Sequence, residues 1–463
     1  MRPTRWRRST QVVTGVAVLL LIAVVVAVTA VFVVGRSNSD AANAKPLPAP
    51  ATAAPRVVPV ADSAPLPTER GLAAALAPAL ADPNLGMLTG RVTDAITGEE
   101  IWGQRVEVPM QPASTNKLLT AAAALLTLDR DARLTTTVVA ADQRTDPGLV
   151  ILKGGGDTTL SAAPRGTDTW YRDAARISDL AEQVRRSGIS PTAVGVDISA
   201  YSGPNMAVGW DPLDIGGGDI APMAPVMLDG GRTQPVDENS RRSTTPATDA
   251  GRALAVALDL DPATVTVRPA PATGARQIAA VKSPPLMERL RVMMNASDNV
   301  MAESIGREVA AQVGRPQSFD GAAQAVLAAL RGVGVDTAGA TLRDSSGLSV
   351  DDRLTALTLD EVLTAATGDE HPDLRPLVDL LPIAGGSGTL SNRYLDTRPG
   401  REAAGWLRAK TGSLTGTNSL AGIVTDVRGR VLTFSLMSNN AGPNGRTALD
   451  AVAATLRACG CGS

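Results

Sequence analysis

Histidine is nearly missing from this chain, which has one example, His371, among 463 residues. His371 lies in the polar run GDEHPD, where Pro372 interrupts regular structure, and we expect an exposed loop residue there. A histidine-rich zinc site is therefore excluded, and a Ser-His-Asp triad would have to use this one residue. A serine nucleophile elsewhere in the chain needs a different base.

Cysteine is also scarce, and the two examples, Cys459 and Cys461, lie close to the C-terminus. Without a second pair they cannot form a zinc ribbon. A bridge between them would close a very small ring, and pairing between chains is the alternative. We expect this tail to have little bearing on chemistry, and the sequence implies neither a metal nor an organic cofactor.

Neither sign of charge is in clear excess, because 46 acidic residues face 44 basic ones. The chain therefore lacks the excess of positive charge that is typical of a nucleic-acid-binding protein. Lysine is rare among the basic residues, with five examples: Lys45, Lys117, Lys153, Lys282 and Lys410. Arginine cannot give up its proton whereas a buried lysine can, so each lysine calls for an explanation.

The N-terminus carries an arginine cluster followed by an apolar stretch at residues 12–34. At about 1.5 Å per residue this stretch exceeds the ~30 Å hydrocarbon core of a bilayer, and it is longer than most signal-peptide cores. We therefore expect residues 1–36 to form a cytoplasmic end and a single-pass membrane anchor, with the rest on the extracytoplasmic side of the plasma membrane. The run Ala-Asn-Ala at 42–44 resembles a cleavage site, so a cleaved signal peptide and secretion are the alternative.

The rest of the chain divides by composition into a spacer and a folded part. Residues 37–69 are rich in Ala and Pro without apolar periodicity, which favours a semi-extended linker. Helical patterns dominate residues 70–137 and 277–463, whereas residues 138–276 are β-rich and punctuated by turn signals. We expect an α/β (α+β) fold in which both chain ends build one domain around an inserted accessory domain at 138–276.

Three short motifs follow one another along the folded part: Ser-Thr-Asn-Lys at 114–117, Ser-Asp-Asn at 297–299 and Lys-Thr-Gly at 410–412. Each alone is a weak signal, since the first also fits a helix start with a surface lysine and the third fits any strand end. All three in order, using two of only five lysines, are hard to reach by chance. They indicate one catalytic site.

The first two motifs supply a nucleophile and a base. We expect Ser114 to begin a helix, with Lys117 one turn later on the same face. A serine hydroxyl is a poor nucleophile until a base takes its proton, and a desolvated lysine of lowered pKa is the remaining candidate. Ser297 would relay the proton to the leaving amine, and Asn299 would hold a substrate amide. Glu303, beside the second motif, is expected to be a buried structural partner.

The third motif supplies substrate contacts. Lys410 offers a positive charge for a C-terminal carboxylate, and an edge strand at this point would pair with an extended peptide. The backbone N–H groups of Ser114 and Ser413 are the expected oxyanion donors. With Asn299, the expected substrate-binding residues are Lys410, Thr411, Gly412 and Ser413.

These motifs resemble the active site of the class C low-molecular-mass penicillin-binding proteins, the D-alanyl-D-alanine carboxypeptidase/endopeptidase family. The resemblance covers about residues 70–455. Segments outside the three motifs that carry it are LKGGGDTTL (152–160), SPPLMERLRVMMNASDNVMAESIGREV (283–309), RDSSGLS (343–349), LPIAGGSGTLSNR (381–393) and AKTGSLTGTNSLAGIV (409–424).

The resemblance implies the penicillin-recognising serine transpeptidase/β-lactamase-like fold and a serine DD-peptidase. It also implies that Ser114 is acylated by peptidoglycan stem peptides, with Lys117 as base, and that β-lactam antibiotics are covalent inhibitors. The alternatives are a β-lactamase or an esterase on the same scaffold, or a non-catalytic envelope binding protein. An E-x-x-L-N segment is missing between the first two motifs, which disfavours a class A β-lactamase. The balance of carboxypeptidase and endopeptidase activity, the cross-link type and the oligomeric state stay open.

Overall fold

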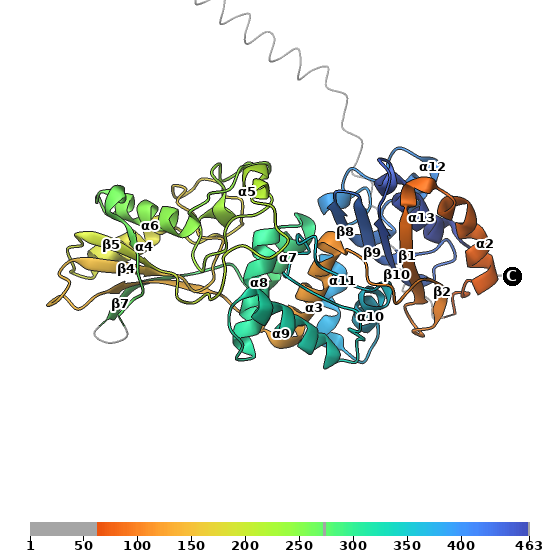
Figure 1. Cartoon of the computed structure of the whole chain (residues 1–463), viewed down its shortest axis with the longest axis horizontal. Helices are drawn as coiled ribbons and strands as arrows, with labels where there is room; N and C mark the ends of the chain where they lie inside the picture. The colour runs from red at the N-terminus through yellow and green to blue at the C-terminus, as the bar shows by residue number, and fades with distance from the viewer. Residues whose placement is uncertain (1–62, 272–274, 462–463) are drawn as a thin grey trace, which may run out of the picture. The chain divides into compact units, whose positions relative to one another are not determined.

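The computed structural model describes residues 63–271 and 275–461, and within these ranges the strands form two five-stranded sheets (Figure 1). The predicted membrane segment at 12–34 lies outside the described residues. Among the helices of the two described ranges, none is both long and apolar enough to cross a bilayer.

The first sheet is antiparallel throughout and is built from both ends of the folded part. Its strand order is β2-β1-β10-β9-β8. The strands span β1 (Met87–Asp94), β2 (Glu100–Gln104), β8 (Leu407–Leu414), β9 (Thr417–Thr425) and β10 (Val431–Asn439). Because β1 pairs with β10, the N-terminal segment closes onto the C-terminal one, and β8 is left at an edge.

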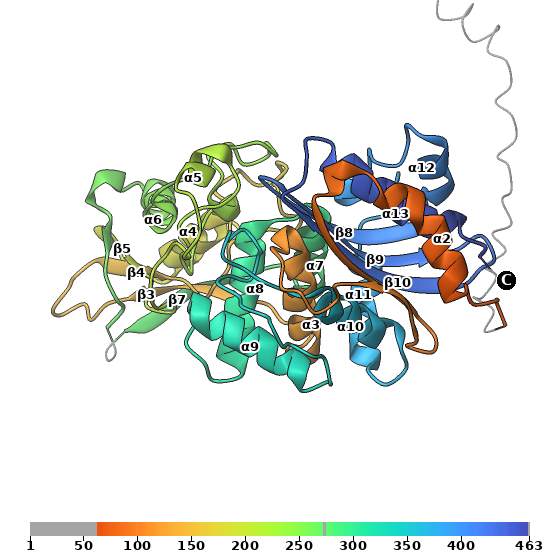
Figure 2. The ribbon, with the colours of Figure 1, turned by 45° about the vertical axis from the view of Figure 1, so that its right-hand side comes forward.

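Helices cover both faces of this sheet (Figure 2). On one face α2 and α13 pack against each other and α13 contacts β9; on the other, α10 contacts β10 and β1. The helices of these layers are α2 (Glu69–Leu80), α3 (Lys117–Thr127), α7 (Leu286–Asn295), α8 (Asn299–Gln312), α9 (Phe319–Arg331), α10 (Ala356–Thr367), α11 (Pro376–Leu380), α12 (Arg398–Ala403) and α13 (Gly445–Ala458). Helix α3 is buried from Lys117 to Leu125, which accounts for its almost wholly apolar sequence.

The second sheet is mixed, with strand order β6-β5-β4-β3-β7. Strand β4 pairs antiparallel with β3 but parallel with β5, and the crossover between β4 and β5 includes α4. The elements of this region are β3 (Thr135–Ala140), β4 (Leu149–Lys153), α4 (Ile177–Arg186), β5 (Ala193–Asp197), α5 (Leu213–Gly217), α6 (Pro246–Ala257), β6 (Thr266–Val267) and β7 (Arg276–Lys282). Helices α4 and α6 pack together beside this sheet.

The remaining turns of helix are short 3-10 segments. They are η1 (Pro83–Leu85), η2 (Ala113–Asn116), η3 (Asp229–Gly231), η4 (Pro262–Thr264), η5 (Pro372–Leu374) and η6 (Gly388–Leu390). His371 lies directly before η5 and is partly exposed.

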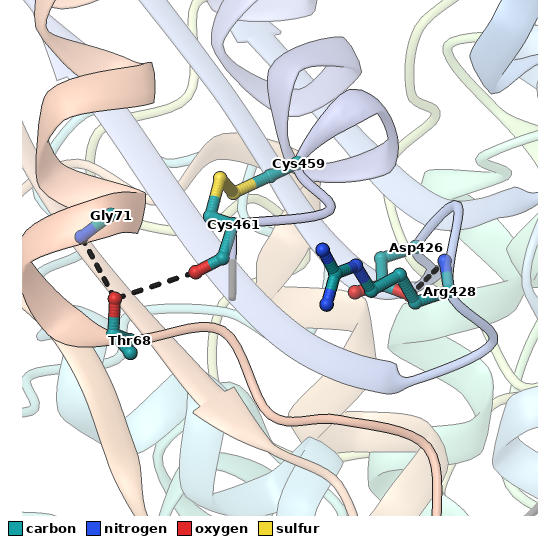
Figure 3. The surroundings of a disulfide bond; sticks show 6 residues. All are labelled: Thr68, Gly71, Asp426, Arg428, Cys459 and Cys461. Atoms are coloured by element: carbon teal, nitrogen blue, oxygen red, sulfur yellow. Dashed lines mark hydrogen bonds between the residues drawn. A yellow bond between two sulfur atoms is a disulfide. The ribbon is translucent and has the colours of Figure 1, made fainter. Parts of the chain in front are cut away.

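The C-terminal tail is fastened to the start of α2 (Figure 3). Cys459 and Cys461 form a disulfide within the chain, which decides between the two pairings left open by the sequence. The carbonyl of Cys461 accepts a hydrogen bond from the Thr68 backbone N–H at 3.1 Å. The Thr68 hydroxyl in turn caps α2 by accepting from the Gly71 N–H at 3.1 Å, so the tail and the first helix stabilise each other.

Candidate active site

Ser114 and Lys117 lie where η2 passes into α3. The Lys117 Nζ donates hydrogen bonds to Ser114 Oγ at 2.9 Å, to Asn299 Oδ1 at 2.6 Å and to the Ser346 carbonyl at 2.8 Å. The residue before Ser114, Ala113, has φ of 48°, a left-handed conformation that is costly for a residue with a Cβ. The turn that presents the serine to its lysine is therefore held in place by the surrounding structure.

Burial lowers the pKa of Lys117 to about 8. The carboxyl groups of Asp344, Glu303, Asp298 and Asp352 act in the opposite direction and keep the pKa from falling further. With this pKa, about one Lys117 side chain in ten is neutral at pH 7 and able to accept a proton.

The second motif lies between helices α7 and α8 and contributes the first residue of α8. Ser297 adopts a positive φ of 55°, and Asp298 caps α8 by accepting from the Met301 N–H at 3.0 Å. Asp298 is buried, and its other oxygen accepts from the Tyr171 hydroxyl at 2.8 Å. Ser297 lies directly before this cap, and its Oγ accepts a hydrogen bond from Lys410 of the third motif at 2.9 Å.

Asn299 is the first residue of α8 and joins the site to the segment around α5. Its Oδ1 accepts from Lys117, and its Nδ2 donates to the Asp219 carbonyl at 3.0 Å. The carboxamide is thus already engaged at both ends, which fixes its orientation.

The third motif lies on the edge strand β8. The Lys410 Nζ donates to Ser297 Oγ at 2.9 Å and to the Thr411 carbonyl at 2.8 Å. Burial lowers the pKa of Lys410 well below its usual range, and the positive charges of Lys117 and Arg393 add to that effect. A carboxylate bound beside Lys410 would act in the opposite direction and raise that pKa.

The outer edge of β8 is hydrogen-bonded to residues 382–384 over its first half, whereas its second half makes no backbone–backbone hydrogen bond on this side with any residue that the structure describes. The Ala409 N–H donates to the Pro382 carbonyl at 2.9 Å, so the odd-numbered residues of β8 direct their backbone groups away from β9. Thr411 and Ser413 follow the same alternation. Gly412 lies so close to η2 that a Cβ there would come within 2.8 Å of the Pro112 carbonyl, which explains a glycine at this position.

A cavity of about 680 Å³ opens in front of these groups. The predicted site residues that line it are Ser114, Ser297, Asn299, Thr411 and Ser413. Lys117 and Lys410 are fully buried behind this wall. The structure therefore brings all three motifs together, with Ser114 and Ser297 lining the cavity and each accepting a hydrogen bond from a buried lysine Nζ.

Asp344 is a supporting residue to which the sequence analysis gave no role. Its carboxylate accepts from the backbone N–H groups of Ser346 at 3.0 Å and Gly347 at 2.6 Å, which fixes the loop whose Ser346 carbonyl faces Lys117. The same carboxylate accepts from Trp210 Nε1 at 2.7 Å. The motif RDSSGLS at 343–349 was a signal for this loop, but nothing local pointed to Trp210.

The cavity is also polarised in charge. Asp211, Asp214 and Asp219 line it from the segment around α5, whereas Arg393 and Arg446 line it from elsewhere in the chain. Burial, together with the charge of Asp219, raises the pKa of Asp214.

A serine hydrogen-bonded to a buried lysine, beside the edge strand of an antiparallel sheet covered by helices on both faces, defines the penicillin-recognising serine hydrolases. The model of the D-Ala-D-Ala carboxypeptidase 3 (S13) family matches residues 72–240 and 235–457, and the chain belongs to this family. The predicted family, fold class and enzyme class are thereby confirmed. Residues 1–59 match a second model, described as the carboxypeptidase Rv3627c-like N-terminal domain.

Similar proteins agree with this assignment. The chain is 72% identical to carboxypeptidase DacB of Mycolicibacterium smegmatis over the whole of both chains. It is 31% identical to the D-alanyl-D-alanine carboxypeptidase of an Actinomadura species, covering 81% of this chain and 82% of that one. The crystal structure of penicillin-binding protein 4 from Haemophilus influenzae shares the fold, with a TM-score of 0.67 at 22% identity over 84% of this chain and 98% of the other.

Proposed function

We propose that this carboxypeptidase acts on the D-Ala-D-Ala ends of peptidoglycan stem peptides through an acyl-enzyme on Ser114. The observation that carries the proposal is the 2.9 Å hydrogen bond between Ser114 Oγ and Lys117 Nζ, with the pKa of Lys117 lowered by burial to about 8. A nucleophile and a base of suitable pKa are therefore already in contact.

In the acylation step Lys117 takes the proton from Ser114, and Oγ attacks the carbonyl carbon of the penultimate D-alanine. The oxyanion that forms lies at the backbone N–H groups of Ser114 and Ser413. The proton that Lys117 took from Ser114 is passed through Ser297, which accepts a hydrogen bond from Lys410, to the leaving amine, so the amide bond breaks and Lys117 is neutral again. Water then attacks the ester with Lys117 again as base, which frees the shortened peptide and restores Ser114.

The terminal carboxylate of the substrate is assigned to Lys410 and Thr411, and Asn299 and Gly412 complete the binding wall. The carboxylate restores the positive charge on Lys410, which burial disfavours in its absence. Binding of substrate and protonation of Lys410 are thus coupled.

β-Lactam antibiotics are the proposed covalent inhibitors, because they present a reactive amide to the same serine. The Haemophilus influenzae protein of similar fold has also been solved in complex with a novel β-lactam.

Labelling with fluorescent penicillin tests the nucleophile. Ser114→Ala in the full chain should abolish labelling, while Ser202→Ala, which removes an exposed serine outside the cavity, should leave it unchanged. Circular dichroism checks that both variants fold. Labelling of the Ser114→Ala protein at the parental rate would overturn the assignment.

For location, we propose that residues 12–34 anchor the enzyme in the plasma membrane and that residues 138–276 form an accessory domain inserted in the extracytoplasmic body. The 23-residue apolar stretch and the arginine cluster before it support the anchor. The full chain should therefore fractionate with membranes. Mass spectrometry that finds a mature N-terminus at Lys45 would instead favour cleavage and secretion.

A further inference from the structure

A buried carboxyl group that the proposed mechanism leaves unused lies behind the base. Asp352 is fully buried and lies at the end of a loop, residues 344–351, that follows Arg343. Its Oδ1 accepts a hydrogen bond from the Arg343 backbone N–H at 2.6 Å. Beside this bond, the backbones of Thr341 and Arg353 exchange two hydrogen bonds, both at 2.8 Å. The two ends of the loop are therefore held together at Asp352.

The 344–351 loop supports the base directly, because its Ser346 carbonyl accepts from Lys117 Nζ at 2.8 Å. Asp344 organises the loop from inside, since its carboxyl group accepts hydrogen bonds from four N–H groups. These are the backbone N–H groups of Ser346 at 3.0 Å, Gly347 at 2.6 Å and Ser349 at 2.7 Å, and Trp210 Nε1 at 2.7 Å. Four such donors favour the ionised form of Asp344.

The second oxygen of Asp352 lacks an ordinary donor. Asp352 Oδ2 is buried, and no N–H or hydroxyl group of the two described ranges donates to it. The carboxyl groups of Asp352 and Asp344 are nevertheless hydrogen-bonded to each other. A hydrogen bond between two carboxyl groups requires a proton, because ionised carboxylates only accept. Since Asp344 already accepts four N–H groups, the proton belongs to Asp352.

The ionisable groups near Asp352 come from three parts of the chain. They are Asp344 and Arg353 on its own segment, Glu303 with its partner Arg307 on α8, and Lys117 on α3. Burial, followed by the charge of Asp344, raises the pKa of Asp352 well above its usual range. The Arg353 guanidinium donates to the backbone carbonyl of Asp352 at 2.7 Å and so leaves the carboxyl group to Asp344.

We propose that Asp352 is a positioning residue of the acylation site, held as a neutral acid whose proton bridges to the Asp344 carboxylate. The bridged pair fixes the loop whose Ser346 carbonyl accepts from Lys117. A neutral Asp352 also withholds a negative charge that would disfavour the neutral amine of Lys117. The inference rests on the proposed function, because it gives Asp352 a role in orienting the proposed base.

Two replacements separate the hydrogen bonds of Asp352 from the space that it fills. Asparagine donates to Asp344 and accepts from the Arg343 N–H without carrying a charge, whereas leucine fills a similar volume and does neither. The second-order rate constant for acylation of the full chain by fluorescent penicillin is measured. It should stay within about twofold of the parent in Asp352→Asn and fall by about tenfold or more in Asp352→Leu, which leaves a buried carboxylate short of a partner.

The pH profile of acylation shows whether Asp352 is neutral in the working enzyme. A carboxylate at this position would raise the pKa of Lys117, so its replacement by asparagine would move the midpoint of the profile to lower pH. Because the acid is already neutral, the midpoint of Asp352→Asn should equal that of the parent. A shift to lower pH by about half a unit or more would show that Asp352 is ionised.

Unfolding tests the protonation of Asp352 independently of acylation. An acid that keeps its proton when folded and loses it when unfolded destabilises the folded state as the pH rises above about 3.9. The unfolding equilibrium constant of the parent should therefore rise about tenfold per pH unit relative to that of Asp352→Asn between about pH 5 and pH 7. Asp351→Asn is the matched control, because it removes an exposed carboxyl group one residue away, and its ratio to the parent should stay constant.

The outcomes separate this proposal from the proposed function. A ratio of parent to Asp352→Asn that does not change with pH, or parental acylation of Asp352→Leu, would remove the role of Asp352 while leaving Ser114 and Lys117 in theirs. Circular dichroism checks that the leucine variant folds; if it does not, the asparagine profile and the unfolding ratio still decide. If penicillin does not label the parent protein, the proposed function fails, and the unfolding ratio alone shows whether Asp352 is protonated.

Discussion

The pH dependence of acylation tests whether Lys117 is the base. With its pKa lowered to about 8, roughly one molecule in ten carries the neutral amine at pH 7 and roughly one in a hundred at pH 6. The second-order rate constant for acylation by fluorescent penicillin should therefore rise about tenfold per pH unit up to about pH 8 and then level off. A rate constant that stays flat between about pH 6 and pH 8 would refute the assignment.

Glu303 allows this profile to be shifted deliberately. Its buried carboxylate acts to raise the pKa of Lys117, so Glu303→Gln should lower that pKa and move the profile to lower pH. A loss of about 1.4 kcal/mol of attraction moves the midpoint by about one pH unit, which makes acylation at pH 7 several-fold faster. Burial raises the pKa of Glu303 itself to about 7, so its charge, and with it the shift, is greatest above neutral pH.

Glu308→Gln is the matched control for this experiment. Both glutamates lie on α8 and pair with a buried arginine, Glu303 with Arg307 at 3.2 Å and Glu308 with Arg289 at 2.5 Å. Both substitutions should lower the free energy of unfolding, because each leaves a buried guanidinium without its anion. Only Glu303→Gln should shift the acylation profile. An equal shift in the two variants, or none in Glu303→Gln, would show that the carboxylate does not act on the base.

Two further predictions concern the second lysine and the supporting loop. Lys117→Arg should abolish acylation, because arginine cannot accept a proton. Lys410→Arg should retain a measurable acylation rate, lowered because the larger guanidinium enters a buried site. Equal acylation rates in the two variants would show that Lys117 is not the base. Trp210→Phe removes the N–H group that donates a hydrogen bond to Asp344. It should lower the free energy of unfolding, measured by urea titration, by about 1–3 kcal/mol. An unchanged midpoint at unchanged slope would contradict the stabilising role of this contact.

Local patterns were enough to predict most of the elements around the site. Helix α13, which spans Gly445–Ala458, lies in the range 277–463 where helical patterns were expected, because its apolar residues recur with the helical period. The edge strand expected after the third motif is β8. Within the helical range 277–463, by contrast, α7 and α8 are separated at Ser297, which adopts a positive φ. That conformation is supported by contacts with residues far away in sequence, so no local pattern predicts it.

The state of Lys410 was not predictable for a similar reason. The sequence analysis assumed a cation, because lysine is charged in water at neutral pH. In the structure its side chain is completely buried, and its Nζ is held by Ser297 and Thr411. The lowered pKa follows from burial and from the second lysine nearby, and both depend on how three distant motifs pack. The motif was enough to identify Lys410, but the sequence alone did not predict that burial lowers its pKa.

The segment expected as an accessory insertion, 138–276, is joined to the chemistry by hydrogen bonds. The Asp219 carbonyl accepts from Asn299 at 3.0 Å, and Trp210 Nε1 donates to Asp344 at 2.7 Å. The first contact orients the carboxamide that accepts from Lys117, and the second steadies the loop whose carbonyl does the same. Cutting the segment out would leave a buried carboxylate and the carboxamide short of partners next to the base. If Ser114 and Lys117 act as proposed, the segment therefore helps to set the geometry of the acylation site, in addition to forming the proposed inserted domain.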